Sequence, residues 1–394
     1  MTEAVMPHAV ITEEMVVSMR ERIGVSLRIE HSINNDLATR LAIAKFAGGI
    51  GDSNPLWTDR DYANASVYQG LVAPPTFVLA CFSGLQFGWP GLGAFHNATT
   101  LEFLAPIYEG DLIDCECVYE GFTGPQPSKF AGRVVVDHFR NAYRNQLGEA
   151  VATVHWSVMN YERGSALARA NDSDVHTAHH WLEDELDEIE ARVLAECPRG
   201  ATTRFWEDVS VGDVLDSVTK GPIGMTDEVA FVAGGGAPIP RLTANGTALR
   251  SYREHPAWAF RDPDTSALEP IYSVHYNRAA ARAMGVPLQY DVGFQRQCWQ
   301  VQLLTNWMGD EGWIKKADAQ YRGFVYLSDV VELGGVVERK VVDGDGDAVV
   351  EVTTFARNQR DEDVMPGHAT ISLPAREFGP RPLARRNCPR GSRS

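Results

Sequence analysis

An internal repeat limits the folds open to this chain more than any other property of its sequence. Identical residues coincide when the chain is aligned with itself at an offset of 218 positions: Ala63 with Ala281, Trp89 with Trp307, Gly91 with Gly309 and Asp111 with Asp329. Near the end of each half, the residues RNQ at 144–146 recur at 357–359, where the offset has fallen to 213. A repeat of this length indicates a duplicated domain, so we expect two similar halves that differ in the length of their late loops.

Both halves show the same coarse order: an entry segment, a loop, one long apolar helix and several strands. In the first half we expect the long helix within 71–89, which is apolar over the length of a membrane span, but whose Pro, Gly, Ser and Gln residues favour a helix buried inside a protein. The expected strands are rich in Val, Ile and Thr, and they lie near Leu112–Tyr119, Gly132–His138 and Ala150–Val158, and near Val330–Val342, Ala348–Phe355 and His368–Leu373. One helix wrapped by an antiparallel sheet, present twice, predicts an α+β fold of the double hotdog type.

The repeat also divides the chain into domains. We expect an N-terminal hotdog domain over 1–164, a linker over 165–203, a C-terminal hotdog domain over 204–380 and a disordered basic tail over 381–394. Apolar residues of the linker, between positions 182 and 193, recur at helical spacing and predict an amphipathic helix with an acidic outer face.

Composition argues against several classes of function. The formal net charge is −16, whereas nucleic-acid-binding proteins concentrate Lys and Arg, so a nucleic-acid partner is not expected. The six Cys include no Cys-x-x-Cys pair, which argues against a zinc site. The acidic stretch 342–347 has calcium-like spacing, but Thr354 stands where a calcium loop needs a bidentate Glu, so a hairpin turn is expected. The first residues lack the pattern of a signal peptide, so we expect a cytoplasmic protein with free thiols.

Gly51 to Ala63 reads GDSNPLWTDRDYA, and here the chain resembles the MaoC-like dehydratase and (R)-specific enoyl-CoA hydratase family, whose signature is G-D-x-N-P-x-H-x-D. The stretches YQGLVAPPTF and PIYEGDLI are similar to the first halves of family members. The stretches VHYNRAAARAMG, YDVGFQRQCW and NWMGDEGW are similar to the second halves of its large double-hotdog members. The resemblance implies a hotdog fold, an acyl-CoA substrate and hydration or dehydration of a thioester. It implies neither a metal nor a redox cofactor.

The resemblance also implies how such a site works. The Asp and His of the signature hold or activate a water beside the C2–C3 bond of the acyl chain, because hydration moves a proton to carbon and takes one from water. A backbone N–H at the start of the hotdog helix binds the thioester oxygen as negative charge develops on it, which the N–H groups and the dipole of a helix N-terminus favour. In the family, the glycine that provides this N–H lies a fixed distance after the His.

The first half breaks this pattern at two positions. Asp52 and Asn54 are kept, but Trp57 stands where the His belongs, and its indole cannot exchange a proton at neutral pH. Pro75, 18 residues after Trp57, stands at the glycine position, and it has no N–H to donate although proline suits the first turn of a helix. We therefore expect the first half to be a scaffold that covers the acyl or CoA moiety, with Asn54 and Trp57 among the substrate contacts.

The second half keeps the groups that the first half lacks. His275 lies 218 positions after Trp57, and Gly293, 18 residues further on, opens a helix at the oxyanion position. Pro270 replaces the Asp of the signature, so the acid that partners His275 is left open. The candidates are three acids of an insertion before His275, together with an acid just before the helix and the acid of the first half: Asp262, Asp264, Glu269, Asp291 and Asp52.

Two polar residues lie one step inside the same helix. Gln295 and Arg296 are candidates for binding the substrate or a phosphate group, and they are equally suited to pairing with a nearby acid. Asp291 is likewise suited to capping the helix as well as to catalysis.

The leading hypothesis is a hydro-lyase with His275 as the acid/base group, the N–H of Gly293 as the oxyanion donor and an acid such as Asp291 as the second group. The alternatives are a hotdog thioesterase and a non-catalytic acyl-CoA-binding or partner subunit, which the missing Asp supports. The expected ligand is an acyl-CoA, a small-molecule substrate whose acyl chain can be bulky, and neither a membrane nor a nucleic acid is expected as a partner. A homodimer of double-hotdog subunits and a complex with a partner subunit are both compatible with the sequence.

Overall fold

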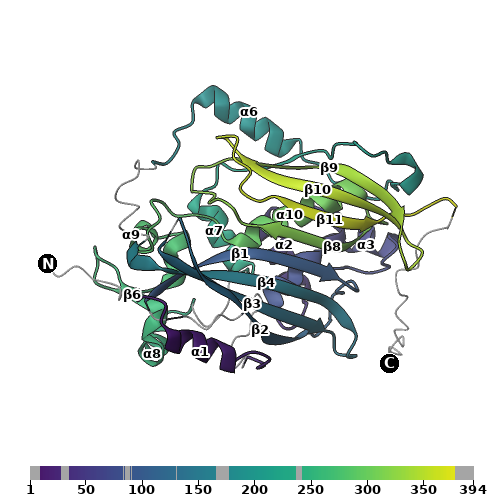
Figure 1. Ribbon diagram of the computed structural model, residues 1–394. Coiled ribbons are helices and arrows are strands. Elements are labelled where there is room, and N and C mark those ends of the chain that lie inside the picture. The colour runs from purple at the N-terminus through teal and green to yellow at the C-terminus, as the bar shows by residue number, and fades with distance from the viewer. Residues whose placement is uncertain are drawn as a thin grey trace.

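The computed structural model describes residues 9–27, 35–82, 84, 89, 91–129, 131–165, 177–236 and 242–377. Their centre is one nine-stranded antiparallel sheet with the order β2-β3-β4-β1-β8-β11-β10-β9-β5 (Figure 1). The expected basic tail, 381–394, lies outside the described residues. The strands of this sheet are β1 Leu92–Phe103, β2 Asp114–Pro127, β3 Arg133–Arg144, β4 Ala150–Glu162, β5 Val218–Lys220, β8 Trp313–Gln320, β9 Val331–Val342, β10 Ala348–Asn358 and β11 Gly367–Ser372.

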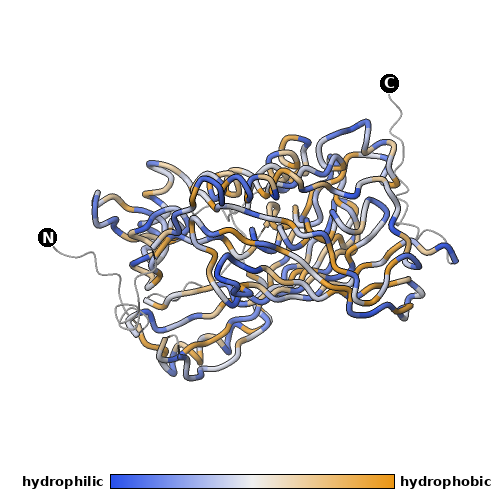
Figure 2. Tube along the Cα trace, turned by 90° about the horizontal axis from the view of Figure 1, so that it is seen from above, coloured by the Kyte–Doolittle hydropathy of each residue, from blue (hydrophilic) through white to orange (hydrophobic). Residues whose placement is uncertain are grey.

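Helices α2, α7 and α10 pack against one face of the sheet, and α6 runs along its far edge above β9 (Figure 1). Hydrophobic segments run through the middle of the molecule, whereas the outlying loops are largely hydrophilic (Figure 2). A small hairpin of β6 Ala259–Arg261 and β7 Leu268–Pro270 stands apart from the main sheet. The helices are α1 Glu13–Glu21, α2 Arg40–Ile50, α3 Arg60–Ala65, α4 Val78–Cys81, α6 Glu183–Leu194, α7 Met225–Ala233, α8 Asn245–Glu254, α9 Arg278–Ala283 and α10 Gly293–Met308, with short 3-10 turns η1 Pro55–Trp57, η2 Pro75–Phe77, η3 Trp206–Asp208, η4 Pro256–Trp258 and η5 Ile271–His275.

The two halves join where β1 pairs with β8. Thr100 lies opposite Asp318 in this antiparallel ladder, and these two residues are also 218 positions apart. The repeat is therefore a pseudo-twofold symmetry whose axis passes through this pair. This is the predicted α+β double hotdog, with both sheets fused into one.

Equivalent hydrogen bonds in the two halves explain the repeated RNQ motif. In the first half, Gln146 Nε2 donates to Asp111 Oδ1 at 3.1 Å, and in the second half Gln359 Nε2 donates to Asp329 Oδ1 at 2.7 Å. Each hydrogen bond links the turn after one strand, β3 or β10, to the residues just before the neighbouring strand, β2 or β9. The motif is thus part of the framework rather than of a site.

The expected strands are confirmed, although the sequence reading did not include β1 and β8, which join the halves. The linker helix is confirmed as α6, which buries Ile189 and leaves its acidic residues exposed. The turn at 342–347 is the predicted hairpin between β9 and β10, and its three Asp side chains surround the ammonium group of Lys315.

The prediction of a long helix in the first half is wrong. Within 71–89, η2 leads into α4, which ends at Cys81, and Phe82 is extended with φ −163° and ψ 119°. Gly84 then has φ +138°, and a Cβ there would lie 2.3 Å from the ring of Trp156 on β4. The close approach of this ring requires glycine and a non-helical backbone, so the helix stops. None of the helices in the described ranges is both long enough and apolar enough to cross a membrane.

Candidate active site

A short strand-like pairing fixes the backbone just before α10. Asp291 N donates to Val325 O at 2.9 Å and Leu327 N donates to Gln289 O at 3.0 Å, on either side of a bridge between Tyr290 and Tyr326. Two residues later α10 begins at Gly293. The first N–H groups of a helix have no partner inside it, so this start presents free donors.

His275 is positioned by the turn η5 and by the cap of the next helix. Asn277 caps α9 by accepting hydrogen bonds from Ala279 N at 2.8 Å and Ala280 N at 3.2 Å. In the first half, Asp59 caps α3 in the same way, two residues after Trp57. The structure therefore places His275 and Trp57 at equivalent positions, as the repeat predicts.

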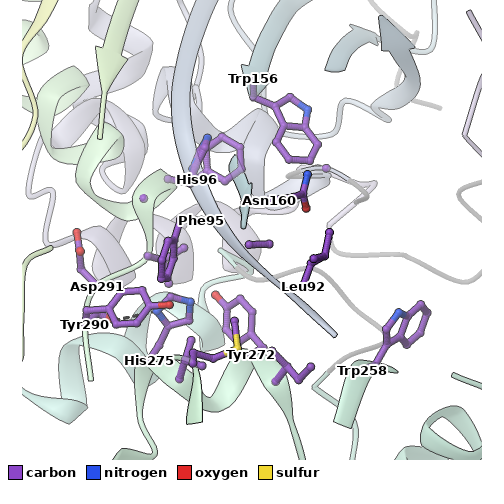
Figure 3. A pocket seen from close by; sticks show the side chains of 18 of the residues that line it. Leu92, Phe95, His96, Trp156, Asn160, Trp258, Tyr272, His275, Tyr290 and Asp291 are labelled. Atoms are coloured by element: carbon purple, nitrogen blue, oxygen red, sulfur yellow. Dashed lines mark hydrogen bonds between the residues drawn. The ribbon is translucent and has the colours of Figure 1, made fainter. Parts of the chain in front are cut away.

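His275 and Gly293 line the same cavity, which has a volume of about 220 Å³. Its walls come from both halves: β1 supplies Phe95 and His96, and the insertion before η5 supplies Trp258 (Figure 3). A second cavity, of about 250 Å³, is also lined by Phe95, His96 and Gly293. It continues toward Phe324 and the exposed Arg322. The two cavities therefore meet at the start of α10.

The environment of His275 makes its imidazole a base. Its Nδ1 lies 2.8 Å from Tyr290 O, and because a carbonyl oxygen only accepts, Nδ1 carries the proton. Burial is the largest effect on the pKa of His275 and lowers it. The carbonyl of Tyr290 and the charge of Asp291 raise this pKa, but by less than burial lowers it. The ring is therefore neutral at physiological pH and its Nε2 is free to accept a proton.

Asp291 is held by arginine rather than by His275. Arg296 Nε donates to Asp291 Oδ2 at 2.8 Å and its Nη2 donates to Oδ1, and the pair is almost fully buried. Arg296 Nη1 also donates to the carbonyls of Gly323 and Val364, each at 3.0 Å. The pair fixes the backbone beside the helix start, and the guanidinium balances a carboxylate charge that would oppose negative charge there.

The acids of the insertion do not meet His275. Asp262 accepts from Asn277 Nδ2 at 2.8 Å and from backbone N–H groups of its own turn, which are structural contacts. Asp264 is exposed, and Glu269 is not among the residues that line the cavity. Arg241, also in this insertion, lies outside the described residues.

Gln295 meets an acid that the sequence reading did not single out. With its amide turned to satisfy its neighbours, Gln295 donates to both carboxylate oxygens of Glu228 on α7, at 3.1 and 3.2 Å. Burial, followed by the charges of Asp291 and Asp227, raises the pKa of Glu228 well above its ordinary value. Glu228 and its amide partner therefore sit behind the start of α10, and the repeat gave no signal for them because they lie outside the signature.

The first-half candidates form a separate and nearly filled site. Asn54 and Trp57 line a cavity of only about 20 Å³ together with Pro75. Asp52 accepts from Asn54 N at 3.0 Å and is absent from the lining of the His275 cavity. Burial raises the pKa of Asp52 to about 6, while Asn54 N–H, Trp57 and Lys220 act to lower it. The structure therefore does not bring Asp52, Asn54 or Trp57 together with His275, and Asp52 caps a turn.

A second imidazole, which the sequence reading missed, lies at the start of α10. His96 is on β1, where a bulge between His96 and Ala98 interrupts the pairing with β4. Its Nδ1 is 2.6 Å from the point where a Cβ on Gly293 would lie, and its Nε2 is 2.7 Å from Thr99 Oγ1. Burial, followed by the charge of Arg296, lowers the pKa of His96 to about 3. The sequence held one signal for His96: the residue 218 positions later, Ile314, is apolar, so the two halves differ in polarity at this position.

Comparisons with known proteins agree with this architecture. Residues 27–154 match the family described as the FAS1-like dehydratase domain region. A UPF0336 protein of Streptomyces avermitilis is 32% identical over 122 residues, which span 29% of this chain and 77% of the relative. A solved MaoC-like dehydratase covers 90% of this chain and 99% of its own, with a TM-score of 0.62 and 16% identity. A solved protein of Mycobacterium tuberculosis that is described as having a double hotdog fold covers 89% of this chain and 96% of its own, with a TM-score of 0.51 and 12% identity.

Proposed function

We propose that this chain, which belongs to the MaoC-like hotdog dehydratase family, adds water to a 2-enoyl thioester or removes it from a 3-hydroxyacyl thioester, with acyl-CoA as the substrate. The observation that carries the proposal is the convergence of the His275 imidazole and the start of α10 at Gly293 on one cavity. Acid/base chemistry next to an oxyanion site is what hydration of a conjugated thioester requires.

In the proposed reaction, His275 Nε2 takes a proton from water as the water oxygen bonds to C3. The electrons of the C2–C3 double bond move toward the thioester oxygen, where the N–H groups at the start of α10 stabilise the enolate. His275 then returns the proton to C2, so the atoms of one water are added and the imidazole is regenerated. Dehydration is the same path in reverse.

The two cavities suit the two arms of such a substrate. We assign the acyl chain to the cavity of about 220 Å³, whose lining includes Trp156, Trp258 and Phe294. The pantetheine arm would leave through the cavity of about 250 Å³, whose rim carries the exposed Arg322. The thioester would then lie where the cavities meet, at Gly293.

The test is turnover of crotonyl-CoA and longer enoyl-CoAs by the wild type and by His275→Gln. Loss of the base is expected to lower kcat by about 10²–10⁴-fold. His368→Gln, a surface histidine on β11 in the same half, is the matched control and should retain wild-type rates. Equal turnover by the wild type and His275→Gln would remove His275 from the reaction.

A non-catalytic acyl-CoA-binding subunit is the second candidate, because Pro270 occupies the position of the signature acid in the half that keeps the His. This function predicts that acyl-CoA binds with no change in the thioester in any assay. A third outcome, release of free CoA thiol, would indicate a thioesterase instead. Measuring hydration by loss of enoyl absorbance and hydrolysis by thiol release separates the three.

A further inference from the structure

The N-terminal half contributes a polar group to the cavity of the C-terminal half. His96 lies on β1, yet its Nδ1 is 2.6 Å from the point where a Cβ on Gly293 would lie, and its ring centroid is 4.4 Å from that of Phe294. His96 is also part of the wall that both cavities share. An imidazole in this place faces whatever group the start of α10 binds.

Hydrogen bonds behind His96 hold its ring in place. Thr99 Oγ1 lies 2.7 Å from His96 Nε2 and 3.3 Å from the hydroxyl of Tyr321. Tyr321 donates to Gln297 Oε1 at 2.9 Å, and Gln297 Nε2 in turn donates to a backbone carbonyl. The ring of Tyr321 packs on that of His96, with centroids 4.3 Å apart, and Tyr321 is bound to Gln297 on α10, so the ring of His96 is held near the start of that helix.

The internal repeat provides a comparison that isolates His96. At the site of the second half, His275 and Gly293, together with His96 from the first half, surround an open cavity of about 220 Å³. Their mates at the offset of 218 positions are Trp57, Pro75 and Ile314, which together line the cavity of about 20 Å³. The site of the first half, which has no base and no helix-start N–H, therefore also has an apolar residue in place of this imidazole. The three positions differ as a set, which indicates that they serve one purpose.

We propose that His96 is a substrate-binding residue of this site, whose Nδ1–H donates to the thioester oxygen beside the N–H groups at the start of α10. The proposed contact takes the tautomer with its proton on Nδ1, in which the Thr99 hydroxyl, 2.7 Å away, donates to Nε2. The inference rests on the proposed function in taking a thioester as the ligand. It also gives the first half a direct part in the chemistry of the second.

A neutral imidazole is suited to this task. The low pKa of His96 keeps the ring uncharged over the physiological range, so it donates a hydrogen bond without carrying a full positive charge beside Arg296. Removal of one such donor from an oxyanion site typically lowers kcat by about 10²–10³-fold.

The experiment compares two ligands in the full-length protein by calorimetry. Butyryl-CoA has the thioester oxygen, and its thioether analogue S-butyl-CoA lacks it. His96→Leu is expected to weaken butyryl-CoA binding about tenfold, the cost of one lost hydrogen bond, and to change S-butyl-CoA binding less than twofold. His96→Asn, whose amide N–H can replace Nδ1–H, should restore most of the difference, and Ile314→Val at the mate position should leave both affinities unchanged.

Equal weakening of both ligands by His96→Leu would show that the side chain only shapes the cavity, and would overturn the proposal. A wild type with no preference for the thioester over the thioether would overturn it too. In the turnover assay, His96→Leu should lower kcat about 10²–10³-fold and raise KM by about the tenfold that is lost in butyryl-CoA binding. If the wild type turns over no enoyl-CoA while His96→Leu still selectively loses butyryl-CoA, the hydratase function fails and the His96 contact stands.

Discussion

Protonation of His275 sets the pH range in which the proposed reaction can run. The neutral ring is the base, and burial lowers its pKa below the ordinary value of 6.5, so activity should rise with pH through an apparent pKa below 6.5 and then level off. The measurement is kcat/KM for an enoyl-CoA between pH 4.5 and 8. This acid limb should disappear in the residual activity of His275→Gln. A limb centred above pH 6.5 would contradict a buried, neutral base.

Gly293 is required for steric reasons, and the effect is testable through His96. A Cβ on Gly293 would lie 2.6 Å from His96 Nδ1, so Gly293→Ala should lower the free energy of unfolding by about 1–3 kcal/mol through overpacking. In a His96→Ala background only the Cβ of residue 96 remains close, at 3.2 Å, so the same change should lower the free energy of unfolding by less than about 1 kcal/mol. Urea denaturation of the four proteins of this cycle measures the coupling. Independent, additive effects would mean that the clash is relieved elsewhere.

Sequence patterns found the part of the site that lies in the repeat signature. His275 and Gly293 follow from the repeat together with the signature and the His-to-Gly distance that the family resemblance implies. His96 comes from β1, which reaches the cavity only through tertiary packing, and Glu228 comes from α7, which contacts Gln295 behind the start of α10. Asp291 was a sound candidate by position, but only the coordinates reveal that Arg296 binds it.

At the scale of elements, local sequence identified the strands better than the helix of the first half. The strands alternate buried and exposed residues, a pattern set by neighbours within each strand. The helix expected in 71–89 ends at Cys81, and beyond it Gly84 packs against the ring of Trp156, which is more than seventy residues away in the chain. An apolar run cannot report a contact of that kind. In the second half no such ring intrudes, and α10 extends over 16 residues.

The loop between β10 and β11 offers a test of how the second half is braced. Arg360 binds the buried carboxylate of Asp329 through Nη1 and Nη2, both at 2.8 Å. Arg360→Leu should lower the free energy of unfolding by about 2–4 kcal/mol, since it leaves a buried charge poorly compensated. The matched control is Arg339→Leu, because Arg339 binds Glu351 with similar two-point geometry on the surface, where the loss should stay below about 1 kcal/mol. Equal losses in the free energy of unfolding for the two variants would mean that the burial of Asp329 does not add to the stability that its ion pair provides.

At the scale of the whole molecule, the two halves share one continuous sheet and one open candidate site. β1 and β8 pair across the pseudo-twofold axis, and His96 reaches from the first half to the helix of the second. The first half keeps the framework and fills its own site with Trp57 and Pro75. Duplication thus permits the loss of one site, because the fold needs both halves while the proposed reaction needs one.

Close packing of α2 against α7 provides a second contact between the halves, and it predicts opposite effects at adjacent glycines. A Cβ on Gly49 would lie 2.6 Å from Ala230 O, whereas a Cβ on Gly48 would meet no atom within 4 Å. Both glycines lie in α2, so alanine brings the same gain in helix propensity at each. Gly48→Ala should raise the free energy of unfolding by about 0.5–1 kcal/mol. Gly49→Ala should lower it by about 1–3 kcal/mol, because the helices must move apart.

Chemical denaturation followed by fluorescence and by circular dichroism measures both changes. If the halves are one cooperative unit, each variant should shift a single transition that both probes report alike. Two transitions in Gly49→Ala, with only one of them shifted, would show that the halves unfold separately and that the α2–α7 contact does not couple them. Equal stabilisation by both substitutions would show that α7 yields to the added methyl group, and the two helices would then not be in the tight contact on which the coupling depends.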